Sequence, residues 1–94
     1  MTIVKTSISH PLRIDEVKVP DASGIIGMTL CPGKKIKSAM SGVWDRDLDI
    51  DLQAIQTWGA QALVNLMEVH EYELLRVPDY VAKVRSCPME YFHL

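Results

Sequence analysis

Residues 51–67 read DLQAIQTWGAQALVNLM, which is a helical pattern followed by a short apolar run. The first half places Leu52, Ile55 and Trp58 at helical spacing, and this gives a helix one apolar face. Gly59 stands where a residue in the left-handed conformation would end that helix. The second half, ALVNLM, has the length and composition of a buried strand. The segment therefore predicts a helix packed on a sheet and favours the α/β class.

The acidic run DRDLDID, residues 45–51, precedes this helix. We expect Asp49 or Asp51 to cap it, because a carboxylate accepts a bond from a free backbone N–H and suits the positive end of the helix dipole. The run also looks like the start of a calcium loop, which needs Gly at its sixth position and Glu at its twelfth. Those positions hold Ile50 and Gln56, so the sequence predicts neither a metal site nor a cofactor.

Three short strands are predicted before this unit. Residues 3–8 and 14–19 alternate between apolar and polar side chains, which is typical of half-exposed strands at the edge of a sheet. Residues 24–30, GIIGMTL, form an apolar run between turn residues, and we expect them to form a buried strand. The segment from Cys31 to Asp49 contains Pro and Gly and indicates a long loop. Such loops are uncommon inside compact domains and are often functional.

After the first helix the pattern continues to alternate. Residues 68–75 favour a second helix, residues 80–85 a third with Val81 and Val84 facing inward, and residues 89–94 a last strand. The predicted order is β, β, β, loop, α, β, α, α, β. Strands that alternate with helices favour parallel pairing, so we expect one mixed, mostly parallel sheet with flanking helices.

Composition narrows the functional class. The 94 residues suffice for one domain, 1–94, with 48% hydrophobic residues, 23% charged residues and a net charge of −2. This balance gives no electrostatic case for nucleic acid or an anionic membrane surface as a partner. The apolar runs are too short to span a bilayer, and the N-terminus lacks the apolar core of a signal peptide. We therefore expect a cytoplasmic protein, in which Cys31 and Cys87 are free thiols rather than a disulfide.

Four side chains are candidates for a functional site. Lys34 and Lys35 follow the turn at Gly33, where backbone N–H groups and two cations can meet an anion; a solvated basic turn is the alternative. His70 follows a predicted strand, at the end where open α/β sheets bind ligands, or it is a surface histidine. Trp44 lies in the long loop and either plugs the loop onto the sheet or contacts a partner.

Cys31 precedes the same turn and is a candidate nucleophile. That role requires a lowered thiol pKa, to which the neighbouring lysines can contribute. A turn with a solvated basic face is the simpler interpretation. No arrangement of nucleophile, base and orienting group is visible elsewhere in the sequence.

Much of the chain also resembles a known family. The resemblance is carried by TSISHPLRIDEV, GMTLCPGKK, SGVWDRDLDIDLQAIQTWGAQALVNLMEVHE and YELLRVPD, residues 6–17, 27–35, 41–71 and 72–79. These segments look like the N-terminal portion of bacterial dual-specificity-type protein phosphatases, which are related to the eukaryotic kinase-associated phosphatase (cyclin-dependent kinase inhibitor 3). The resemblance implies a cysteine-phosphatase fold and a hydrolase that cleaves phosphomonoesters with a Cys nucleophile in an H-C-x5-R loop and an Asp general acid.

The sequence departs from that family at the catalytic residues. It contains no H-C-x5-R, since Cys31 is followed by PGKK and Cys87 by PMEYFH, and the Asp acid is expected after Leu94. We therefore predict an incomplete phosphatase-like fold without its central strand and phosphate loop, and an inactive chain without catalytic residues. The resemblance implies that strands present here flank the missing one, so the sheet closes differently or borrows a strand from another copy in a homo-oligomer. The alternative is a non-enzymatic module whose 31–49 loop binds a phosphoprotein or a small anion.

Overall fold

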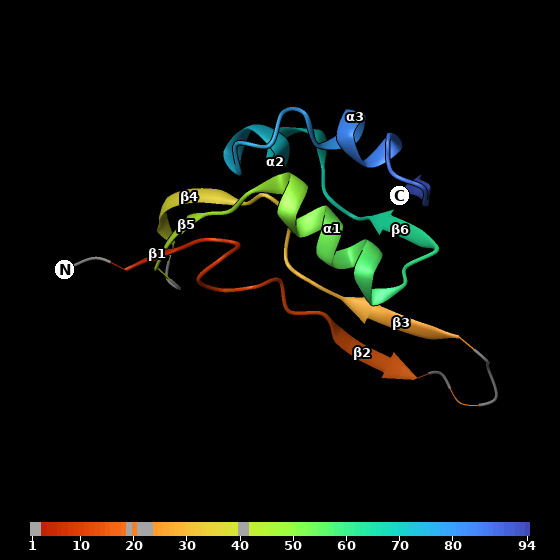
Figure 1. Ribbon diagram of the computed structural model, residues 1–94. Coiled ribbons are helices and arrows are strands. Elements are labelled where there is room, and N and C mark those ends of the chain that lie inside the picture. The colour runs from red at the N-terminus through yellow and green to blue at the C-terminus, as the bar shows by residue number, and fades with distance from the viewer. Residues whose placement is uncertain (1–2, 19, 21–23, 40–41) are drawn as a thin grey trace.

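The computed structural model describes residues 3–18, 20, 24–39 and 42–94. The elements follow the chain in the order β1 (Val4–Lys5), β2 (Asp15–Lys18), β3 (Ile25–Met28), β4 (Lys35–Ala39), β5 (Gly42–Asp45), α1 (Leu48–Trp58), β6 (Ala62–Asn65), α2 (Val69–Leu74), α3 (Tyr80–Arg85) and β7 (Glu90–His93). Figure 1 shows a mixed α/β arrangement, with the helices on one side of the β2–β3 hairpin. The predicted α/β class is confirmed at this level.

The described strands form three small sheets, with the orders β1-β5-β4, β2-β3 and β6-β7. The pairs β1–β5 and β6–β7 are parallel, whereas β2–β3 and β4–β5 are antiparallel. The expected single, mostly parallel sheet is therefore not observed. The pairs β2-β3 and β6-β7 are separate sheets, and in the described residues β3 and β6 are not hydrogen-bonded to each other.

The segment predicted as a long loop, 31–49, contains β4 and β5. They pair antiparallel, with Ile36 opposite Trp44, so the loop prediction is wrong. Ile36, Val43 and Trp44 are strand-favouring side chains, and their preference outweighs the turn signals around them.

Helix α1 begins two to four residues earlier than expected. Asp47 is its N-cap, and its side chain accepts a hydrogen bond from the Ile50 backbone N–H at 3.0 Å. The prediction of Asp49 or Asp51 as the cap is wrong, because both lie inside the first turn. The predicted end is confirmed, since Gly59 adopts the left-handed conformation with φ 103°.

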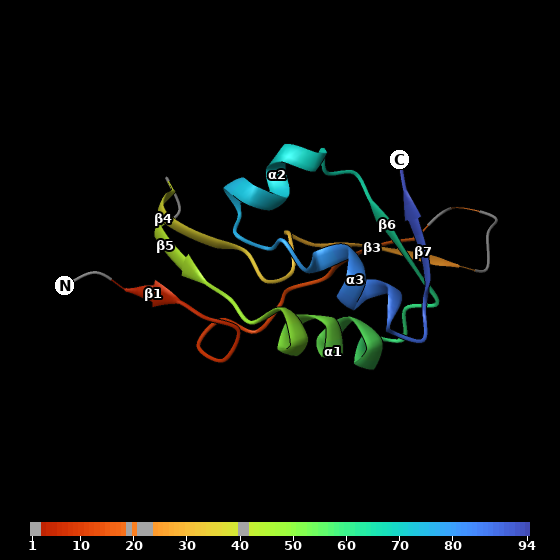
Figure 2. The same ribbon diagram turned by 90° about the horizontal axis from the view of Figure 1, so that it is seen from above.

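The apolar core lies among the three helices. Its buried side chains are Leu48, Leu52, Ile55, Tyr72, Val77, Tyr80 and Val84. Helices α1 and α3 pack against each other, as Figure 2 shows from above. In the described part of the chain, no helix is long and apolar enough to cross a membrane.

Strands β3 and β6 were both expected to be buried, and this expectation is wrong. All four residues of β3 are exposed, and Asn65 alone is buried in β6. Each strand has a sheet neighbour along one edge in the described residues. Their facing sides border an open groove.

Candidate functional site

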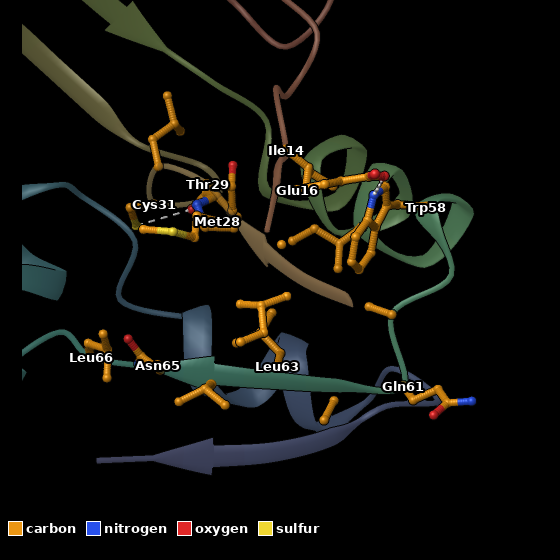
Figure 3. A pocket seen from close by; sticks show the side chains of 18 of the residues that line it. Ile14, Glu16, Met28, Thr29, Cys31, Trp58, Gln61, Leu63, Asn65 and Leu66 are labelled. Atoms are coloured by element: carbon orange, nitrogen blue, oxygen red, sulfur yellow. Dashed lines mark hydrogen bonds between the residues drawn. The ribbon is translucent and has the colours of Figure 1, made fainter. Parts of the chain in front are cut away.

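A groove of about 1230 Å³ lies between β3 and β6. Figure 3 shows the two strands on opposite sides of it, with β7 beyond β6. Its walls are residues 24–32 and 58–67, completed by Ile14, Glu16, Ile55, Glu71 and Tyr80. The groove therefore extends along the whole of both strands.

The wall on the α1 side is built by close packing around Gly27. A Cβ atom there would lie 2.7 Å from Ile14 Cγ2 and 3.0 Å from Trp58 Cη2, so glycine lets the indole approach the β3 backbone. The Trp58 Nε1–H also donates a 2.8 Å hydrogen bond to Glu16 Oε1 on β2. Figure 3 shows the hydrogen bond between Trp58 and Glu16, which together with the packing on Gly27 attaches the β2–β3 hairpin to α1.

The strand walls of the groove are apolar and open. Ile26 and Met28 on β3 are 54% and 60% exposed, and Val64 on β6 and the adjoining Leu66 are 54% and 74% exposed. Each of these side chains lines the groove. The site therefore combines apolar side chains with strand edges that have no partner strand among the described residues.

A cluster of cations surrounds Trp44 on β5. Lys5 Nζ lies 4.8 Å and Lys34 Nζ 4.9 Å from the centre of its ring, with Arg46 Cζ at 5.9 Å. Trp44 is half-buried, and the face of its ring attracts the ammonium groups. Lys34 was predicted as a site residue, whereas Lys5 was missed. Only the pairing of β1 with β5, which places Lys5 beside Trp44, brings it there.

The other two predicted anion ligands make contacts outside this cluster. Lys35 Nζ donates to the Gly33 carbonyl at 3.1 Å, and its backbone N–H donates to the Leu75 carbonyl at the C-terminal end of α2. His70 lies in the first turn of α2, exposed, with Nδ1 3.4 Å from Glu68 Oε2. Lys35 and His70 are thus associated with opposite ends of α2.

The most constrained polar group, Asp51, was missed as a site of interest. Its Oδ1 accepts from Ser7 Oγ and Arg46 Nη2, and its Oδ2 accepts from Gly33 N and Arg46 Nε, at 2.8–3.0 Å. Arg46 and Asp51 are both buried. In the sequence, the only signal for the pair of Arg46 and Asp51 is their position on either side of the helix start.

Asp51 therefore has a structural partner rather than a metal ion. Asp47 caps α1, and Asp49 contacts Lys83 Nζ at 2.8 Å. The described residues contain no group of His, Cys, Asp and Glu side chains able to hold a metal. The acidic run is thus accounted for by capping and ion pairs.

Cys31 lies at the end of the groove and is half-buried. Burial raises the pKa of its thiol to about 11, while the charge of Lys34 acts in the opposite direction. A nucleophilic thiolate needs a lowered pKa, so the environment of Cys31 opposes that role. Cys31 and Cys87 are both free thiols, as predicted.

Comparison with known proteins does not assign the chain to a family. No protein-family model matches the chain, and no match was found among curated proteins or solved structures. The function must therefore be argued from the residues themselves.

Proposed function

We propose that the chain is the N-terminal half of a phosphatase-like α/β domain and has no phosphatase activity of its own. The supporting observation is that two segments carrying the resemblance interlock. Gly33 in the 27–35 segment donates to Asp51 in the 41–71 segment, and the Arg46 backbone N–H donates to the Lys34 carbonyl at 3.1 Å. These residues of the two segments therefore hold the segments together.

The expected inactivity has a chemical basis. The sequence has no H-C-x5-R loop to bind a phosphoryl group and lower the pKa of a cysteine. Cys31 is the thiol nearest to a cationic turn, and burial raises its pKa instead. A protonated thiol at neutral pH is a poor nucleophile toward phosphorus.

Two experiments test the proposal. The chain alone should hydrolyse para-nitrophenyl phosphate no faster than a heat-inactivated sample, and faster hydrolysis would refute the inactivity. Mixing it with a separately produced C-terminal half of a bacterial dual-specificity-type phosphatase, which carries H-C-x5-R, should generate activity. The same half with its loop Cys replaced by Ser is the control. A mixture no more active than this control counts against the family assignment.

The alternative function is that of a non-enzymatic module that binds a small anion or a phosphorylated partner. The cluster around Trp44 favours it, because Lys5 and Lys34 approach the same ring within 5 Å. This function predicts saturable phosphate binding that is weakened by Lys34→Ala. Lys35→Ala is the matched control, since Lys35 Nζ bonds the Gly33 carbonyl instead. Equal effects of the two changes would argue against a site at Trp44.

A further inference from the structure

The groove is bordered by two strands that each have one free edge. In the described residues β3 pairs only with β2, and β6 pairs only with β7. Figure 1 shows β2, β3 and β6 in that order across the molecule, with the arrows of β3 and β6 pointing the same way. Backbone N–H and C=O groups along such edges favour pairing with another strand.

The composition of these strands is that of a sheet interior. The strands read IIGM (β3) and ALVN (β6), without a charged residue. Continuous apolar strands of this kind are typical of sheets covered on both faces. Here Ile26 and Val64 are each 54% exposed. The strands therefore have the composition of buried strands but expose their side chains.

The whole molecule also exposes more surface than its mass predicts. The accessible surface is 6679 Å², whereas a compact chain of 10.6 kDa exposes about 5,500 Å². The excess of about 1,200 Å² is at least as large as the roughly 800 Å² that each partner contributes to a standard protein interface. Part of this exposed surface lies on the apolar side chains of β3 and β6 that border the groove.

We propose that an extended apolar segment of a partner polypeptide inserts between β3 and β6 and pairs with the free edges of both. The groove volume of about 1230 Å³ exceeds the roughly 300–1,000 Å³ of small-molecule pockets. Addition of a strand to an open edge is a recurring mode of peptide recognition. This inference depends on the groove alone and not on the phosphatase proposal.

The free edges also indicate the source of the segment. All seven described strands already pair along at least one edge, so a second copy has no described strand with both edges free. The charged residues that line the groove, Glu16 and Glu71, are both acidic. An apolar segment that carries basic residues is therefore the expected ligand.

The probe is the capped peptide Lys-Val-Ile-Val-Val-Ala-Lys, added to the 94-residue chain. We expect saturable binding by calorimetry and slower amide exchange in both 25–28 and 62–65, by roughly tenfold or more. Two further peptides carry backbone N-methyl groups on alternate residues, one peptide on the odd positions and the other on the even positions. Each therefore lacks the N–H donors along one of its two edges. Both should bind at least several-fold more weakly, because both edges are used.

A matched pair of variants tests the location. Val64 and Val17 are exposed valines in strands, but only Val64 lines the groove. Val64→Arg should weaken peptide binding roughly tenfold or more, because insertion would bury an unpaired charge. Val17→Arg should leave binding unchanged, and thermal unfolding of both variants checks that they fold.

Four outcomes would overturn the proposal. These are no saturable binding, protection of only one strand, loss of binding with only one of the N-methylated peptides, or equal effects of the two arginine variants. A fifth is a concentration-dependent dimer in sedimentation velocity with 25–28 and 62–65 protected before peptide is added. That result would make a second copy the occupant, which is one of the two alternatives that the resemblance implies.

Discussion

At the scale of single residues, the Asp51 carboxylate links three parts of the chain. It accepts four hydrogen bonds, from Ser7 before β2, from Gly33 before β4 and two from Arg46 before α1. Both charges are removed from water, so the pair depends on complete hydrogen bonding. Every buried side-chain polar atom of the described residues has a partner. Asp51 thus connects the segments that precede β2, β4 and α1.

Asp51→Asn should therefore be strongly destabilising. The amide keeps the shape of the side chain but leaves Arg46 as an uncompensated buried charge, which costs about 3–5 kcal/mol. Asp49→Asn is the control, because Asp49 is 71% exposed and pairs with Lys83 at the surface. Urea unfolding measures both variants. Similar midpoints for the two would show that the buried pair does not support the fold.

The buried thiol of Cys31 predicts how the alkylation rate of this residue depends on pH. Burial raises the pKa of its thiol from 9.0 to about 11, so the folded chain keeps this proton where an exposed thiol loses it. Alkylation of Cys31 by iodoacetamide, followed by mass spectrometry, should reach half its maximal rate near pH 11. In urea the midpoint should return to about 9.

The same shift has a consequence for stability. The folded state holds the proton more tightly than the unfolded state, so the contribution of Cys31 is complete below pH 9 and is lost as the pH rises through 11. An alkylation midpoint near 9 in the folded chain would contradict both statements.

At the scale of elements, the contact between β3 and α1 depends on Gly27. Gly27→Ala would place a methyl group 2.7 Å from Ile14 Cγ2 and 3.0 Å from the Trp58 ring. We expect a loss of about 1–3 kcal/mol in unfolding free energy, because overpacking displaces side chains. Gly24→Ala is the matched control, since a Cβ there has nothing within 4 Å. A Gly27→Ala variant as stable as Gly24→Ala would mean that the indole does not pack on β3.

The elements that the sequence predicted well are those with local signals. The helical spacing of Leu52 and Ile55 and the glycine at 59 predict α1, and residues 80–85 form α3 as expected. Local rules failed at the cap, because three aspartates compete and Asp51 is used by Arg46 instead. They also failed at β4 and β5, where Pro and Gly residues predicted a loop but the chain forms an antiparallel hairpin.

The site was harder to predict than the helices because its contacts are distant in sequence. Lys5 reaches Trp44 only through strand pairing, and Ser7 reaches Asp51 only through the fold. The composition of β3 and β6 predicts buried strands, but burial depends on what lies along the other edge. In the described residues the other edge of each strand borders the groove. Composition alone could therefore not predict that the side chains of β3 and β6 are exposed.

At the scale of the whole molecule, stability is unevenly distributed. The buried apolar residues lie among α1, α2 and α3, whereas β2 and β3 have no buried residue. Figure 1 shows the hairpin extending beneath α1. It is attached there by the packing of Trp58 on Gly27 and the hydrogen bond from Trp58 to Glu16. A unit with few buried contacts should open without global unfolding.

Native-state hydrogen exchange should resolve this opening. Amides of 25–28 should exchange through an opening of lower free energy and weaker urea dependence than those of 48–58, because less surface is exposed when the hairpin alone detaches. Trp58→Phe removes the donor to Glu16 and should speed exchange in 25–28 while leaving 80–85 unchanged. Opening free energies for the hairpin and α1 that agree at every urea concentration would show one cooperative unit. In that case the hairpin would be as firmly held as the helical core, despite its exposed side chains.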